Sequence, residues 1–158
     1  MGTRSTRHGC ATELVDALRT DPGAWLPGLS YVLSYVLSYV AEAPDGSVAA
    51  HALLTPCRVG DAPALAPAPV ATAPDHRRGG AGRAVVRALP DAARLRGESL
   101  VLVLGHPEYY PAFGFVPASR FGIGPGFEVP AEVMTALVLD DSVPVPMGVI
   151  RYPAAFGV

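Results

Sequence analysis

The chain has 158 residues, half of them hydrophobic, and a formal net charge of only -2. This length suits one well-packed core and is short for two, so we expect a single domain over residues 1–158. A hydrophobic chain of nearly balanced charge is neither a disordered polypeptide nor a protein that coats nucleic acid through a basic surface. All 12 basic residues are arginines, which we attribute to a GC-rich coding bias.

The two cysteines, Cys10 and Cys57, have neither the spacing of a disulfide framework nor that of a metal site. We therefore expect reduced cysteines, no metal and a cytoplasmic location. The basic N-terminus lacks a following apolar stretch, so no secretory signal is predicted. Residues 24–41 are uncharged, but Pro27, Gly28 and several Ser and Tyr residues make them too polar for a membrane span.

The predicted elements begin with a short amphipathic helix at residues 13–20. A perfect tandem repeat follows, in which the four letters LSYV occur three times over residues 29–40. Because Val and Tyr favour strands and a four-residue unit keeps the two-residue period of a strand, the repeat predicts one long strand. A turn at residues 44–46 and an apolar run at 48–54 then predict the second strand of a hairpin.

The middle of the chain is predicted to form a β-α-β unit. Residues 61–74 are rich in Pro and Ala, and we interpret them as a strand of poor propensity. Residues 82–96 predict a helix with one apolar face and one arginine face, which Pro90 should interrupt or kink. The unbroken apolar run LVLVL at 100–104 predicts a central strand covered on both faces.

Two further strands are predicted at residues 133–139 and 147–152, between turns rich in Pro and Gly. The order of elements indicates a mixed α/β sheet with the β-α-β unit at its centre.

The most informative segment joins the predicted strand at 61–74 to the helix at 82–96. Its residues are Arg77, Arg78, Gly79, Gly80, Ala81, Gly82 and Arg83. Glycines allow a ligand to approach the backbone, and the first amides of a helix have no partner within it, so the segment suits a phosphate-bearing anion. A solvated Gly/Arg loop is the alternative. A P-loop is excluded because Arg83-Ala84 follows the last glycine, and a dinucleotide fingerprint is excluded by Val85.

The spacing Arg77-x-x-Gly80-x-Gly82 resembles the Q/R-x-x-G-x-G/A signature of GNAT acetyltransferases. The later segment GHPEYYPAFGF, at residues 105–115, resembles a block that characterises one GNAT subfamily. The C-terminal segment at residues 150–156 is similar to the closing strand of that subfamily. The resemblance implies an α/β fold, α+β in some schemes, with a mixed, mostly antiparallel twisted sheet, flanking helices and a central β-α-β coenzyme A-binding unit.

The resemblance also implies roles for individual residues. The backbone of Val70, Ala71 and Thr72 would bind the pantetheine arm of acetyl-CoA, and the amides of residues 77–82 would bind its pyrophosphate. Tyr110, four residues before Gly114, would protonate the departing coenzyme A thiolate. A phenol with a pKa near 10 suits that proton transfer.

No general base is identified by the sequence. The candidates are His51, Asp75, His76 and His106, and a chain of waters is an equal alternative. Cys57 as an acyl-enzyme nucleophile has no partner at a suitable spacing.

The chain also departs from the GNAT pattern. The first strand and most of the first helix of the family have no clear counterpart before residue 13. Pro67 removes a backbone donor from the strand expected to bind pantetheine, and Ala112 stands where the subfamily usually has Arg.

The expected activity is transfer of an acetyl group from acetyl-CoA to the primary amine of a small molecule or peptide. We expect no nucleic-acid or membrane partner, and a homodimer is left open. The alternative is a non-catalytic acyl-CoA-binding module, which the departures from the family pattern favour.

Overall fold

The computed structural model describes residues 37–157. The helix predicted at 13–20, the first two copies of the LSYV repeat and the region of the family's first strand lie outside these residues. Within them, eight strands form one sheet in the order β5-β7-β4-β3-β2-β8-β6, and β1 pairs with β2 off this path. The strands are β1 (Leu37–Glu42), β2 (Val48–Val59), β3 (Ala62–Thr72), β4 (Leu100–Leu104), β5 (Val116–Pro117), β6 (Ile123–Gly124), β7 (Met134–Val138) and β8 (Gly148–Arg151).

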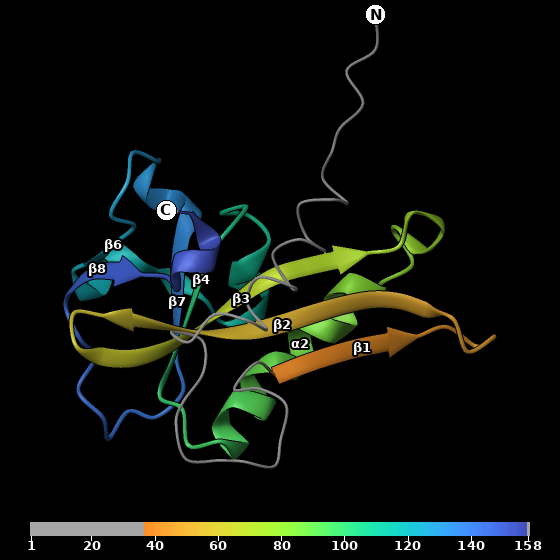
Figure 1. Cartoon of the computed structure of the whole chain (residues 1–158), viewed down its shortest axis with the longest axis horizontal. Helices are drawn as coiled ribbons and strands as arrows, with labels where there is room; N and C mark the ends of the chain where they lie inside the picture. The colour runs from red at the N-terminus through yellow and green to blue at the C-terminus, as the bar shows by residue number, and fades with distance from the viewer. Residues whose placement is uncertain (1–36, 158) are drawn as a thin grey trace, which may run out of the picture.

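The long strand β2 pairs with β1 and β3 and, near its C-terminal end, with β8 (Figure 1). Strands β1, β2 and β3 form an antiparallel meander, and β4 pairs antiparallel with β7, which pairs with β5. The helix α2 (Ala81–Leu95) connects β3 to the parallel strand β4 and packs against β1, β2 and β3. The predicted central β-α-β unit is therefore confirmed.

The parallel strands β3 and β4 are in register at Leu65 and Val101 alone. Beyond Leu65, strand β3 continues for seven residues without pairing to β4, so the two strands separate toward their C-terminal ends. This separation opens the sheet beside the N-terminus of α2, where the Gly/Arg segment lies.

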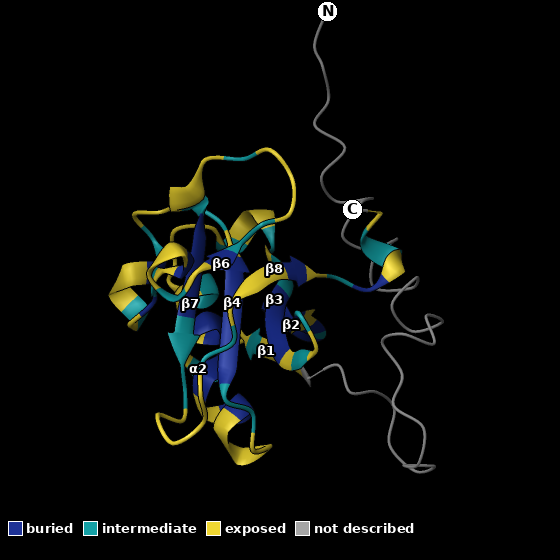
Figure 2. Ribbon diagram, turned by 90° about the vertical axis from the view of Figure 1, so that its left-hand side faces the viewer, coloured by how far each residue is buried: buried dark blue, intermediate teal, exposed yellow. Residues whose placement is uncertain are grey.

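Two apolar clusters cover the two faces of the sheet. Side chains of β4 alternate between them, since Val101 and Val103 join the cluster under α2 while Leu100 and Leu102 join the opposite one. The four form the buried centre of the molecule (Figure 2). The prediction of a central strand covered on both faces is confirmed.

Helix α2 shows the predicted two-sided pattern. Its buried residues include Val85, Val86, Leu89 and Ala93, and its arginines are exposed. The predicted interruption at Pro90 is wrong, because the helix continues through it to Leu95. Pro90 is itself buried, so its contacts with the core offset the missing backbone hydrogen bond.

The prolines of β3 are accommodated by an irregularity in the β2–β3 pairing. Ala52 pairs with Val70, but Leu54 pairs with Pro67, so β3 has one extra residue between these points. The hydroxyl of Thr55 donates a hydrogen bond of 2.8 Å to the carbonyl of Ala68 in this bulge. A bulge is a position where a strand tolerates proline, and the predicted strand of poor propensity is confirmed.

The predicted hairpin and C-terminal strands are also confirmed, with shifted ends. The second hairpin strand extends to Val59, five residues beyond the apolar run that predicted it. The third copy of the repeat lies in β1, where Tyr39 packs against the core and Val40 is exposed. The two faces of this strand therefore alternate as its sequence predicts.

Burial of two acidic groups in the cluster opposite α2 predicts that the fold loses stability at alkaline pH. Burial raises the pKa of the Cys57 thiol from 9.0 to about 12, and the nearby Glu98 carboxylate adds to this shift. Burial likewise raises the pKa of Tyr152 from 10.0 to about 12. Between pH 9 and 12 the native state therefore retains protons that the unfolded chain releases, and the free energy of unfolding falls as pH rises.

Each retained proton contributes a slope of about 1.4 kcal/mol per pH unit. Chemical denaturation of wild type and Cys57→Ala at several pH values measures this slope. Between pH 9 and 10 we expect the free energy of unfolding to fall less steeply in the variant than in wild type. Cys57 is the first of the two groups to titrate in the unfolded chain over this range. Identical slopes would show that the thiol does not contribute.

Candidate functional site

The Gly/Arg segment forms a loop that leads directly into α2. Gly80 precedes the helix in a left-handed conformation, with φ of 87°, which favours glycine. The first helical hydrogen bond runs from the amide of Ala84 to the carbonyl of Gly80. The amides of Ala81, Gly82 and Arg83 precede it and have no partner within the helix, so they are available to an anion.

Gly82 lies against the end of β3. A Cβ atom built on it would approach the hydroxyl oxygen of Thr72 to 2.7 Å, which is closer than real Cβ contacts. The absence of a side chain at position 82 therefore lets the helix N-terminus approach the open strand β3.

Among residues 37–157, no strand pairs with the backbone groups that the end of β3 directs toward the gap between β3 and β4. The amide of Ala73 donates to the carbonyl of Ala49 on the β2 side. Because backbone groups alternate in direction along an antiparallel pair, Val70 and Thr72 direct theirs toward the gap, whereas Ala71 directs its own toward β2. An extended ligand could therefore bind Val70 and Thr72 as an added strand would.

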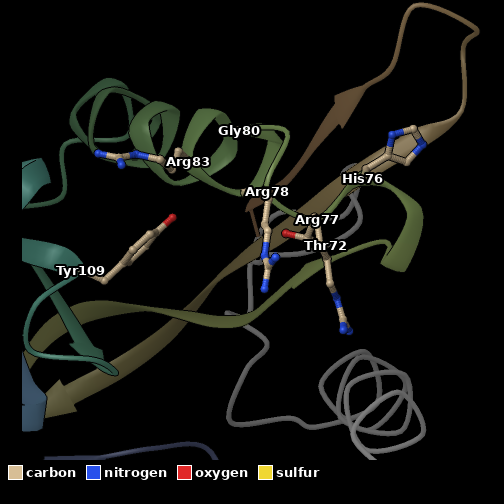
Figure 3. Close-up of a pocket in the computed structure, with 8 residues that line it drawn as sticks. Thr72, His76, Arg77, Arg78, Gly80, Arg83 and Tyr109 are labelled. Atoms are coloured by element: carbon tan, nitrogen blue, oxygen red, sulfur yellow. The ribbon is translucent and has the colours of Figure 1, made fainter.

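These features meet in one cavity of about 300 Å³ (Figure 3). Its volume is at the lower end of the range for small-molecule sites. It brings together the end of β3, the loop, the first turn of α2 and a tyrosine from the segment after β4. Its lining residues are Thr72, His76, Arg77, Arg78, Gly80, Gly82, Arg83 and Tyr109.

The cavity carries strong positive charge. Arg77, Arg78 and Arg83 are exposed, and none of them forms an ion pair within residues 37–157. The first turn of α2 contains no acidic residue, so the helix dipole adds to the same potential. The residues present therefore fit a phosphate-bearing group.

The two adjacent tyrosines occupy different environments. Tyr109 lines the cavity, and its hydroxyl points into it (Figure 3). Tyr110 begins a short 3₁₀ helix, η3 (Tyr110–Phe113), and is only 9% exposed. Its ring packs on the Cα of Gly105, at the end of β4, with the ring of Phe115 at a centroid distance of 5.6 Å. Tyr109 therefore lines the cavity, whereas Tyr110 is not among its lining residues.

Both phenols are held in the protonated form over a wide pH range. Burial raises the pKa of Tyr110, and the neighbouring Tyr109 raises it further. Burial also raises the pKa of Tyr109, while the Arg83 guanidinium acts against that shift. Either hydroxyl is therefore chemically able to donate a proton near neutral pH.

The four candidates for a general base lie in different places. His76 lines the cavity but points away from Tyr109, and its Nε2 lies 3.3 Å from the Ser47 hydroxyl (Figure 3). Asp75 is exposed in the short helix η2 (Pro74–His76). Of these two, only His76 reaches the cavity.

The other two candidates lie outside it. His106 lines a separate hollow of about 600 Å³, together with Pro107, Glu108 and Tyr109. His51 lies on β2, with its Nε2 2.9 Å from the Ser38 hydroxyl. Tyr109 is thus shared by the two hollows, a position that its sequence context does not reveal.

Cys57 takes no part in this site. It is buried in the cluster opposite α2, and its raised pKa keeps it a thiol rather than a nucleophilic thiolate. Within residues 37–157, no group of three or more His, Cys, Asp or Glu side chains could hold a metal ion. No helix in the same range is long and apolar enough to cross a membrane.

The chain was compared with protein families, with curated proteins and with solved structures. No protein-family model matches the chain. The uncharacterized N-acetyltransferase YjhQ of Escherichia coli K12 is 38% identical over 66 residues, a match that spans 41% of this chain and only 36% of that protein.

Two solved structures match nearly the whole chain. One is the GNAT family N-acetyltransferase YhbS from Escherichia coli in complex with CoA, with a TM-score of 0.78 and 23% identity over 94% of this chain and 78% of that one. The other is a GNAT family acetyltransferase from Brucella melitensis in complex with acetyl-CoA, with a TM-score of 0.69 and 28% identity over 98% and 81%.

The fold is therefore that of an N-acetyltransferase, with a mixed, curled sheet beside a helix. The sequence similarity to YjhQ and to the Brucella protein, at 38% and 28% identity, agrees with this fold.

The narrow approach of Gly82 to Thr72 leads to a prediction about ligand binding. In Gly82→Val the new side chain should push the loop away from β3 and obstruct the cavity. We expect acetyl-CoA binding to weaken at least tenfold, or ~1.4 kcal/mol, as measured by isothermal titration calorimetry.

Ala84→Val is the matched control, because it adds a β-branched side chain to an exposed position of the same turn. It should bind acetyl-CoA as wild type does. Equal affinity in a folded Gly82→Val variant would exclude this loop as the binding site.

Proposed function

We propose that the chain is an acetyl-CoA-dependent N-acetyltransferase that acts on a primary amine of a small molecule or peptide. The observation that supports this most strongly is the single cavity that joins the open end of β3, the arginine-rich loop and Tyr109. The two solved structures that share the fold were determined in complex with CoA and with acetyl-CoA.

The donor would lie along the edge of β3. Val70 and Thr72 would hydrogen-bond the extended pantetheine arm through their backbone, with Ala71 between them. The free amides of Ala81 and Gly82, with Arg77 and Arg78 beside them, would hold the pyrophosphate. Such backbone contacts fix the position of the thioester and reduce the entropic barrier to reaction.

In the reaction, the neutral amine attacks the thioester carbon, the new C–N bond forms and the C–S bond breaks. The amine releases a proton, and the departing sulfur accepts one. We assign the donation to sulfur to Tyr110, on the resemblance of its spacing from Gly114 to that of the GNAT tyrosine. Its raised pKa agrees with this assignment, because the hydroxyl retains its proton at neutral pH.

Tyr110 is 9% exposed and, unlike Tyr109, is not among the residues that line the cavity. Its ring meets that of Tyr109 edge-on at a centroid distance of 5.1 Å. The assignment therefore rests on the resemblance of its spacing, and the paired variants below test it.

A non-catalytic acyl-CoA-binding module is the alternative function. Two residues favour it. Pro67 lacks a backbone donor in the part of β3 that has separated from β4, and Ala112, in η3, stands where the GNAT subfamily usually has Arg. A thiol-release assay with acetyl-CoA and a panel of amines distinguishes the two functions. Turnover on any amine supports the transferase, whereas tight binding of acetyl-CoA without turnover on the entire panel supports the binding module.

Because the two tyrosines are adjacent, substituting each of them in turn tests which one is the general acid. Tyr110→Phe retains the ring and removes only the proton donor. We expect kcat to fall by about 10²-fold, the lower end for loss of a general acid, because thiolate is a good leaving group. Acetyl-CoA affinity should stay within about threefold, since no binding contact is assigned to this hydroxyl.

Tyr109→Phe is the matched variant and should retain most of the activity. A reversal of these two results would transfer the role of acid to Tyr109, whose hydroxyl points into the cavity. Full activity in both variants would mean that water or His106 delivers the proton.

A further inference from the structure

Arg83 differs from the other two arginines that line the cavity. It belongs to the first turn of α2, immediately after Gly82, and its side chain extends along the helix toward the segment that follows β4 (Figure 3). That segment, Tyr109–Phe113, is called the tyrosine turn below. Arg83 therefore lies between the anion-binding loop and the residues assigned to proton transfer.

The contacts of Arg83 are with the tyrosine turn. Its guanidinium carbon lies 5.8 Å from the centroid of the Phe113 ring, within the range of a cation–π interaction. The ring of Phe113 lies 5.2 Å from that of Tyr109, which meets the ring of Tyr110 edge-on at 5.1 Å. A continuous series of contacts thus joins Arg83 to both tyrosines.

The charge of Arg83 also acts on this turn. The guanidinium opposes the rise in the pKa of Tyr109 that burial causes. Besides Tyr110, the charged or titratable groups around Tyr109 are those that line its two hollows. These are His76, Arg77, Arg78, Arg83, His106 and Glu108.

We propose that Arg83 is a positioning residue for the tyrosine turn, whereas Arg77 and Arg78 serve the phosphates of the donor. The guanidinium binds the exposed side of the Phe113 ring and so fixes the ring of Tyr109, against which Tyr110 packs. This division of roles rests on the proposed transferase function. All three arginines contribute positive charge to the cavity, but the proposal assigns a different role to Arg83.

Kinetics with two different acetyl donors can distinguish a positioning role of Arg83 from a phosphate-binding role. Acetyl-CoA carries the phosphates, and the S-acetyl thioester of pantetheine carries none. Loss of the Arg83 contact in Arg83→Met should lower kcat by about fivefold, the factor that matches a cation–π interaction at an exposed site. We expect the same factor with both donors and little change in the KM for acetyl-CoA. A raised KM for acetyl-CoA, with normal kinetics on the pantetheine thioester, would overturn the proposal.

Variants of neighbouring residues provide the controls. Arg87→Met removes an equally exposed cation one turn further along α2 and should leave kcat unchanged. Arg83→Lys retains a cation and should restore part of the lost rate. In a Phe113→Leu background, Arg83→Met should have little further effect, because the ring that it contacts is gone. Full additivity of the two changes would contradict the proposed contact.

A spectroscopic measurement tests the same contact without turnover. Titration of Tyr109, followed by NMR of ring-labelled tyrosine, reports on the charge beside its hydroxyl. Arg83→Met should raise the pKa of Tyr109, since the charge that opposes the burial effect is removed, and Arg87→Met should not. An unchanged pKa would refute the placement of Arg83. Absence of turnover in wild type, with this shift present, would refute the transferase function alone.

Discussion

The separation of β3 from β4 is the constraint on which the site depends. Parallel strands normally pair along their length, yet these two are in register at a single point, Leu65 opposite Val101. Beyond it, no strand of the described part of the chain pairs with the backbone groups on one side of β3, a state that proteins usually cover or avoid. An extended ligand that bonds to Val70 and Thr72 would satisfy these groups, which gives the open edge a function.

The remainder of the fold stabilises this opening. Strand β2 pairs with β3 as far as Thr72, and α2 packs against both strands through its buried face. The opened edge is therefore supported by one neighbouring strand and one helix. The same helix presents its free amides and Arg83 at the opening, so a single element supplies both structural support and positive charge.

The sequence predicts those elements whose local pattern matches their final environment. The run LVLVL has no polar position, so it requires cover on both faces, and the alternation of Val101 and Leu102 between the two clusters confirms this. The apolar face of α2 and the Gly/Arg loop are predicted for similar reasons. The prediction of strand β3 depends on its place between two other elements more than on its composition, because Ala and Pro disfavour strands. In the structure, pairing with β2 stabilises this strand.

Other features depend on tertiary contacts that a sequence does not express. Pro90 is unfavourable in an isolated helix, but burial compensates for it. The separate environments of Tyr109 and Tyr110 arise in a tight turn that rotates adjacent side chains by about 120°. Because the two letters are identical, only the packing of Tyr110 on Gly105 and Phe115 determines which ring is buried. The role of Arg83 depends in the same way on the position of Phe113.

Hydrogen exchange of the backbone amides with and without acetyl-CoA tests the central claim most directly. If the donor occupies the gap between β3 and β4, exchange should slow in residues 70–72 and in the loop and first turn at 78–84. The segment at residues 140–148, which contributes no residue to the cavity, should exchange as before. Protection confined to other parts of the chain, or unchanged exchange at saturating acetyl-CoA, would contradict the claim that this open edge binds the donor.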